Sequence, residues 1–195
     1  TPEEAERYLP DIQRFVHVVY GWLWYEGALK LDELLSLTLS VFQPAQWYSP
    51  DRARTIFKAD PSFRVLVGNT ISIEAVKHPL KVLKEKEERH LPPRTFAIDE
   101  LVAIDAGPLP LTPREEEIER ELNQQASRKV SLRSLQQMMR DTDRPSEITG
   151  IVIDLCQPRD INEANHFAQL LTEVWNNTFR YELRGRTPNE VLGGG

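Results

Sequence analysis

The stretch FRVLVGNTISIEAV, residues 63–76, decides how this 195-residue chain is interpreted, because its pattern of apolar residues differs from that of the preceding sequence. Short runs of β-branched and apolar residues flank the pair Gly68-Asn69 on both sides. Glycine and asparagine tolerate a positive φ, as a tight hairpin turn requires. The stretch therefore predicts two short antiparallel strands that are joined at this pair.

Three helices are predicted before this hairpin. In the first, about residues 9–25, apolar residues recur at every third or fourth position, and Gly27 is expected to end the helix. The second lies in KLDELLSLTLSVF, residues 30–42, with Asp32 as its expected N-cap. The third begins near residue 50, where Ser49 provides the N-cap and Pro50 occupies the first helical position.

Three helices followed by a hairpin is the order of a winged helix-turn-helix, which we place at residues 8–78. From Pro79 onward the chain is predicted to be helical almost throughout, so a helical domain is expected at residues 79–192. Capping boxes at residues 112–115, 160–163 and 187–190 predict the starts of three of its helices. The predicted fold class is mainly α: an N-terminal winged-helix-like module with a short β-hairpin, followed by an α-helical region.

Charge is unevenly distributed along this chain, whose formal net charge is −6. Between residues 50 and 94, ten Lys and Arg residues stand against six Asp and Glu residues, a local excess of +4. Cations on the third helix of such a module are placed to meet DNA phosphates or base edges. We therefore predict that DNA is the partner, bound by residues of the third helix and of the hairpin region: Arg52, Arg54, Lys58, Arg64, Lys77 and Lys81.

Two carboxylates weaken this prediction. Asp51 and Asp60 flank the basic residues of the third helix and would repel phosphate. The alternative interpretation is an ordinary solvated helix face in a winged-helix fold that is used for contacts with proteins.

Aromatic residues in the first quarter of the chain indicate this second kind of partner. Trp22 and Trp24 cannot both point along one narrow helical stripe, so one of them is expected to meet another element, domain or subunit. With Trp47 and Tyr48 they would form a surface for another protein. The protein would then be an adaptor or scaffold, binding through this surface and its acidic helices.

The sequence contains no catalytic or cofactor-binding signature. The patterns Gly-x-Ser-x-Gly, His-Glu-x-x-His and the phosphate loop do not occur. Two Glu-x-x-His pairs, at residues 87–90 and 163–166, have the spacing of di-iron sites, but such sites need glutamates from two further helices. We therefore expect a non-enzymatic binding or regulatory protein that holds neither a metal nor a cofactor.

Several features favour a cytoplasmic protein. A single cysteine, Cys156, excludes an internal disulfide framework and a multi-cysteine zinc site. No apolar run approaches the ~20 residues of a membrane span, so no membrane partner is expected. The acidic opening TPEEAERYLP does not resemble a secretory signal. A helix start at Thr187 that runs into three glycines predicts a shortened chain or a linker to another module.

The stretch LLTEVWNNTFRYELRGRTPNEV, residues 170–191, resembles the segment that precedes the zinc-binding motif in bacterial SEC-C-motif-containing proteins of unassigned function, mostly from Firmicutes or phage-related. The upstream order of helices with LDELL, residues 31–35, then a hairpin and acidic helices, is similar to these proteins too. The cysteine-rich motif itself is absent from this sequence. The resemblance therefore implies bacterial relatives, but neither zinc binding nor a reaction.

Overall fold

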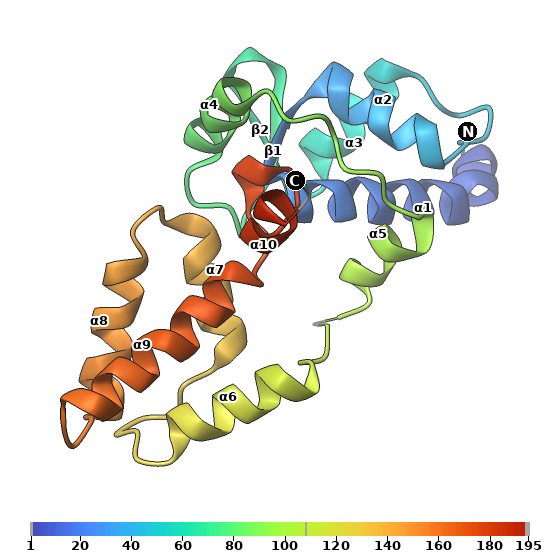
Figure 1. Cartoon of the computed structure of the whole chain (residues 1–195). Helices are drawn as coiled ribbons and strands as arrows, with labels where there is room; N and C mark the ends of the chain where they lie inside the picture. Colours follow the sequence, from blue (N-terminus) through green and yellow to red (C-terminus); the bar gives the residue numbers. More distant parts are fainter. Residues whose placement is uncertain (1, 108, 194–195) are drawn as a thin grey trace. The chain divides into compact units, whose positions relative to one another are not determined.

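The structure is a computed structural model that describes residues 2–107 and 109–193 (Figure 1). The chain divides into two compact units, Thr1–Leu109 and Pro110–Gly195. The chain is mainly helical and contains a small three-stranded antiparallel sheet, so the predicted class is confirmed at this level. None of the described helices combines the length and the apolar composition that crossing a membrane requires.

The described part of the first unit alternates helices with short strands. In chain order its elements are α1 (Pro2–Glu26), β1 (Ala28–Lys30), α2 (Leu31–Val41), α3 (Pro50–Ala59), β2 (Phe63–Leu66), β3 (Thr70–Ile73), α4 (Pro79–Arg89) and α5 (Ile98–Asp105). A short 3-10 turn, Val67–Asn69, joins β2 to β3.

The local signals that predicted the helices and the hairpin are confirmed in most cases. Gly27, with φ of 73°, follows the last residue of α1, and the Ser49 side chain caps α3 by accepting from the backbone N–H of Arg52. At the hairpin turn, Gly68 and Asn69 have φ of 66° and 53°. The two residues thus occupy the left-handed region that glycine and asparagine tolerate best.

The predicted N-cap of the second helix is wrong. α2 begins at Leu31, so Asp32 lies within the first turn and Lys30 holds the cap position without a side-chain cap. The chain reaches this point in an extended conformation because Ala28–Lys30 form a strand that the sequence did not predict. Three residues are too few to show the alternation that marks a strand.

The sheet has the strand order β1-β3-β2, and both pairings are antiparallel. Leu29 and Val65 both pair with Ile71, and Phe63 pairs with Ile73, so these apolar side chains share one face of the sheet. The Phe63 ring contacts the Phe57 ring of α3 at 5.2 Å between centroids. This face therefore packs on the helices, and the opposite face carries the intervening residues.

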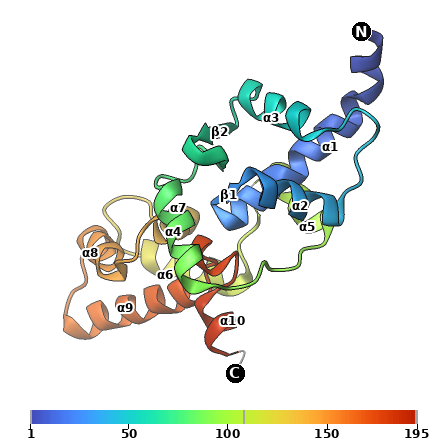
Figure 2. The same cartoon turned by 90° about the horizontal axis from the view of Figure 1, so that it is seen from above.

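α1 is the central helix of the first unit and lies between α2 and α5 (Figure 1). At Gly21 the backbone of α5 comes so close that an added Cβ would lie 2.3 Å from the Leu101 carbonyl oxygen. Trp22 packs edge-on against Phe96, at 5.4 Å between ring centroids. Figure 2 shows that the first turns of α1 extend beyond α2 and α3.

This packing explains why the first unit extends to Leu109, whereas the sequence analysis divided the chain after residue 78. α5 packs on α1, and α4 is joined to the end of α1 by an ion pair. The Lys86 ammonium lies 3.0 Å from the Glu26 carboxylate and also donates to the Ala28 carbonyl. Residues 79–107 therefore belong to the first unit, and Val82, Phe96 and Leu101 are buried in it.

The second unit consists, in its described part, of helices and connecting loops. Its helices are α6 (Pro113–Asn123), α7 (Leu132–Asp141), α8 (Pro145–Cys156), α9 (Ile161–Asn176) and the short α10 (Pro188–Leu192). The capping boxes at Thr112 and Thr187 are confirmed, with reciprocal bonds to Glu115 and Glu190. At the third, Asp160 caps α9, but the Glu163 carboxylate accepts from the backbone and the side chain of Arg159.

One apolar core fills the second unit. Its buried residues come from α6, α7, α8, α9 and the loop before α7: Ile118, Leu122, Val130, Leu132, Leu135, Met139, Ile148, Val152, Cys156, Phe167, Leu170, Leu171 and Val174. This unit therefore has a core of its own within the described residues.

The loop between α9 and α10 carries half of the stretch that resembles the SEC-C-containing proteins. It folds back on itself, with the Arg180 N–H donating to the Arg186 carbonyl at 3.0 Å. The buried Arg180 guanidinium pairs with Glu182 and donates to the Met139 and Thr142 carbonyls at 2.6 and 2.7 Å. In this structure the arginine therefore fastens the loop to the end of α7.

Candidate functional site

The cations predicted on α3 do not lie on one side of the helix. With 3.6 residues per turn, Arg54 and Lys58 are only about 40° apart around the helix, whereas Arg52 lies more than about 100° from both. Lys58 is exposed and Arg54 is half-buried. The structure therefore brings Arg54 and Lys58 together and places Arg52 elsewhere.

The described part of the protein does not neutralise Arg54 and Lys58. Neither side chain forms an ion pair with any residue that the structure describes, and the buried Arg54 Nε has no hydrogen-bond partner there. Asp51 lies about 60° from Arg54 around the helix, so the three charges sum to +1. Arg54 and Lys58 therefore form a small basic patch on this flank of α3, and the Asp51 carboxylate lies next to it.

The three cations predicted near the hairpin have different surroundings. Arg64 pairs with Ser72 and lies on the sheet face that points away from α3, where its Nη1 donates to the Val76 carbonyl at 3.2 Å. Lys81, on α4, lies 3.6 Å from the Glu85 carboxylate one turn away. Lys77 is exposed between β3 and α4. All three of these residues thus have interactions with other groups of the protein.

A further cation at the hairpin was missed by the sequence analysis. Lys30, on β1, is exposed and donates from its ammonium to the Gly68 carbonyl at 3.1 Å. The two residues are 38 positions apart in the chain, and only the pairing of β1 with β3 brings Lys30 to the turn. No local pattern in the sequence marks this placement.

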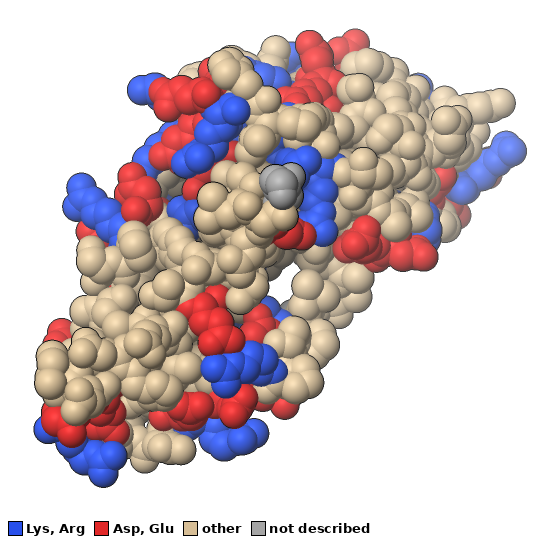
Figure 3. Space-filling model, viewed as in Figure 1, with Lys and Arg blue, Asp and Glu red and all other residues tan. Residues whose placement is uncertain are grey.

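Basic and acidic side chains are mixed on the face of the molecule that Figure 3 shows, where Lys and Arg residues stand next to Asp and Glu residues. That face has no broad area of a single sign. Attraction of a polyanion to this face would thus depend on local groups of cations and not on a long-range field.

The aromatic surface that was predicted to bind another protein is not formed. Trp22 is 1% exposed and Trp47 is 5% exposed, and Trp47 packs edge-on against Phe15 at 5.3 Å between ring centroids. Trp24 and Tyr48 are half-buried. Both sides of α1 are covered by other elements, so most of these aromatic rings contribute to the core.

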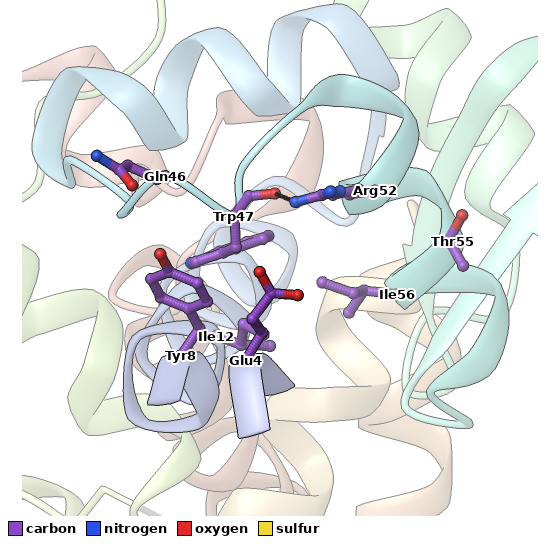
Figure 4. Close-up of a pocket in the computed structure, with 8 residues that line it drawn as sticks. All are labelled: Glu4, Tyr8, Ile12, Gln46, Trp47, Arg52, Thr55 and Ile56. Atoms are coloured by element: carbon purple, nitrogen blue, oxygen red, sulfur yellow. Dashed lines mark hydrogen bonds between the residues drawn. The ribbon is translucent and has the colours of Figure 1, made fainter. Parts of the chain in front are cut away.

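Arg52 lines a groove between α1 and α3, which has a volume of about 580 Å³ (Figure 4). The groove is lined by residues of α1, of the loop before α3 and of α3 itself: Glu4, Tyr8, Ile12, Gln46, Trp47, Arg52, Thr55 and Ile56. The Arg52 Nη1 donates to the Trp47 carbonyl at 2.8 Å. We refer to these eight residues as the α1–α3 groove.

The groove exists because the loop between α2 and α3 folds back over α1. The Asp11 carboxylate of α1 holds this loop, accepting from the Ala45 N–H at 2.8 Å and from the Trp47 indole N–H. The lining residues come from positions 4–12 and 46–56, which no periodic pattern connects. No local pattern in the sequence therefore marks the groove.

Potential metal ligands do not cluster in the described part of the chain. No group of three or more His, Cys, Asp or Glu residues there could hold a metal ion. His166, of the Glu-x-x-His pair on α9, lies 2.7 Å from Glu121 and not against Glu163. The Cys156 thiol is buried and donates to the Leu122 carbonyl, and burial raises its pKa, which disfavours the nucleophilic thiolate.

Comparisons of this chain with models of protein families, with curated proteins and with solved structures found no match.

Proposed function

We propose that this protein binds duplex DNA through its first unit, with α3 and the β2–β3 hairpin as a winged-helix reading surface. The observation that carries the proposal is the order helix, strand, helix, helix, strand, strand, combined with the strand order β1-β3-β2. This arrangement sets the hairpin directly after α3 and packs it on that helix through Phe57 and Phe63.

The charges of α3 and of the hairpin turn support a modest, salt-sensitive contact. Arg54 and Lys58 lie on one flank of α3, and Lys30 lies at the hairpin turn. Each phosphate that such a cation neutralises releases counterions, giving a log–log slope of about −0.9 per phosphate in duplex DNA. With two or three phosphate contacts, binding should weaken clearly as salt rises.

The proposed role is that of a non-enzymatic regulatory protein. Contact with DNA requires only cations that can reach the phosphates and a helix that is exposed to solvent. The alternative, an adaptor that binds another protein, has lost its main support because Trp22 and Trp47 are buried. If the protein does not bind duplex DNA at low salt, the adaptor alternative is favoured.

Fluorescence anisotropy with a labelled mixed-sequence DNA duplex at low and moderate salt tests the proposal. We expect the Arg54→Ala/Lys58→Ala variant to bind several-fold more weakly and its salt slope to fall by about one per lost phosphate contact. The matched control is Arg128→Ala/Lys129→Ala, which removes two exposed cations from the loop between α6 and α7. No binding by the unaltered protein at low salt, or an equal loss in both variants, would contradict the proposal.

A further inference from the structure

We infer that Asp51 on α3 makes the proposed DNA contact selective for cytosine, with Arg54 reading a guanine in the adjacent base pair. This inference rests on the proposed function and names the class of DNA site that the surface prefers. Its starting point is an exposed carboxylate next to the basic patch of α3. A surface that bound phosphates alone would gain nothing from a negative charge at this place.

Asp51 lies on the side of α3 that faces away from the core of the first unit. Ala53 and Phe57, the buried residues of the helix, are about 160° and 120° from Asp51 around the helix axis. Lys58 is only about 20° from Asp51, two turns further along. A duplex that meets Lys58 therefore also meets Asp51, because these two exposed side chains point the same way.

The Asp51 carboxylate is available to a ligand. Within the part of the chain that the structure describes, it accepts no hydrogen bond and forms no ion pair, and the Thr55 hydroxyl donates to the backbone carbonyl of Asp51 instead. An acidic residue in the first turn of a helix also interacts favourably with the helix dipole. That purely structural role is the explanation from which base reading has to be separated.

A carboxylate distinguishes the bases by the groups that they present in the major groove. It accepts a hydrogen bond from the N4 amino group of cytosine, whereas the acceptor atoms of guanine and thymine repel it. Adenine presents the N7 acceptor beside its N6 donor, so cytosine is the base that suits a carboxylate best. Phosphate oxygens repel Asp51 as well. The carboxylate therefore adds selectivity and reduces the overall affinity for DNA.

Arg54 is placed to read the neighbouring base pair. Three residues of helix rise by about 4.5 Å and successive base pairs are about 3.4 Å apart, so Asp51 and Arg54 reach adjacent pairs. The Arg54 Nη groups form no hydrogen bond with a described residue, and such a pair of donors matches the O6 and N7 acceptors of guanine. The inferred site thus contains two adjacent G·C pairs, and Lys58, about 10.5 Å from Asp51 along the axis, is left for a phosphate.

Selection of bound duplexes from a randomised DNA library, followed by sequencing, tests this inference with the full chain at low salt. The unaltered protein should enrich a cytosine at one position and a guanine, on either strand, at the next. In Asp51→Asn the preference at the cytosine position should change to adenine, because an asparagine amide pairs with adenine N6 and N7. Arg54→Ala should lose the preference for guanine.

Fluorescence anisotropy then measures the size of the effect. The unaltered protein should bind the selected duplex about five- to tenfold more tightly than a duplex in which the cytosine is replaced by thymine. Asp51→Ala should bind these two duplexes equally, and it should bind a mixed-sequence duplex more tightly than the unaltered protein does, because a charge that repels phosphate has been removed.

Asp32→Asn is the matched control, because Asp32 is exposed and holds the same second position in α2 that Asp51 holds in α3. This variant should keep the base preference of the unaltered protein. If Asp51 serves only the helix dipole, thermal denaturation will show similar losses of stability in Asp32→Asn and Asp51→Asn, and neither variant will change the selected sequence.

A selected library without a preference for cytosine, or a preference that survives in Asp51→Asn, overturns the inference and leaves the proposed DNA contact standing. Absence of any binding to duplex DNA at low salt overturns the proposed function and the base preference with it. Retention of the unselected library by the unaltered protein tells these two failures apart.

Discussion

Lys86 and Glu26 are charged residues that lie inside the first unit, with side chains 6% and 0% exposed. They connect α4 to the end of α1, and the Lys86 ammonium also donates to the carbonyl of Ala28 at the start of β1. Taking both charges out of water is costly, but removing one of them leaves the other buried without its main counter-charge. In a sequence, Lys86 is indistinguishable from the exposed lysines on the same helix.

Lys86→Met is expected to lower the free energy of unfolding of the first unit by about 3–5 kcal/mol, because Glu26 stays buried after its cationic partner is lost. Urea denaturation followed by tryptophan fluorescence measures the change. The double variant Glu26→Gln/Lys86→Met should recover a large part of the loss, since no charge then remains in the interior. Equal destabilisation in the single and double variants would contradict the ion-pair explanation.

Glu163 is a second residue whose chemistry depends on its neighbours, chiefly Arg159. Hydrogen bonds from the Arg159 guanidinium and from the Arg159 backbone N–H lower the pKa of this carboxyl to about 2, from an ordinary value of 4.5. Because the pKa in the folded state is lower than in the unfolded state, the contact stabilises the fold above pH 4.5. This contribution is lost as the pH falls from 4.5 towards 2.

NMR titration of the side-chain carboxyl carbon of Glu163 should therefore give a midpoint near pH 2 in the unaltered protein. In Arg159→Ala the midpoint should move up towards 4.5, because the guanidinium bonds that favour the carboxylate form are gone. An unchanged midpoint in the variant would show that Arg159 is not the cause.

At the scale of the elements, the packing of α5 on α1 depends on the absence of a side chain at one position, Gly21. Gly21 lies within α1, where glycine is a poor helix former, yet its lack of a Cβ allows the Leu101 backbone to approach. The atoms in the way belong to backbone and not to a flexible side chain. The two helices would have to separate to accept any larger residue.

Gly21→Ala is expected to destabilise the first unit by about 1–3 kcal/mol, the usual cost of overpacking. Gly150→Ala is the matched control in α8, because a Cβ at that glycine would meet nothing within 4 Å. The control should stabilise its helix by up to about 1 kcal/mol through helix propensity alone. Thermal denaturation of both variants measures the contrast, and stabilisation by both would refute the close approach.

The elements that could be predicted from the sequence are those whose ends are set by local groups. Ser49, Thr112 and Thr187 cap helices as expected because each hydroxyl bonds a backbone N–H three residues away. β1 and the buried ion pair could not be predicted, since both depend on partners far along the chain. The same distance hides Lys30 at the hairpin turn and the lining of the α1–α3 groove.

At the scale of the whole molecule, the chain consists of two compact units, each with buried apolar side chains of its own. Leu101 is fully buried in the first unit and Leu122 in the core of the second. Because both residues are fully buried leucines, substituting each in turn tests whether the two cores lose stability separately.

Leu122→Ala is expected to cost about 2–5 kcal/mol and to raise amide hydrogen exchange in α6, α8 and α9. Leu101→Ala should have a similar cost but raise exchange in α1 and α5. Hydrogen exchange followed by mass spectrometry resolves the two patterns. The same increase across both units in both variants would show that the chain unfolds as one cooperative body.

The sequence by itself determined the helical class, most helix starts and the hairpin turn, because caps, prolines and a Gly-Asn pair act on their immediate neighbours. Only the tertiary structure decided which cations share a surface and which charged or aromatic residues are buried. A side chain's exposure depends on elements that the chain brings back from a distance, as when the loop before α3 covers α1 and Trp47 enters the core. For this reason Arg52 belongs to a groove and Arg54 with Lys58 to the opposite flank of the same helix.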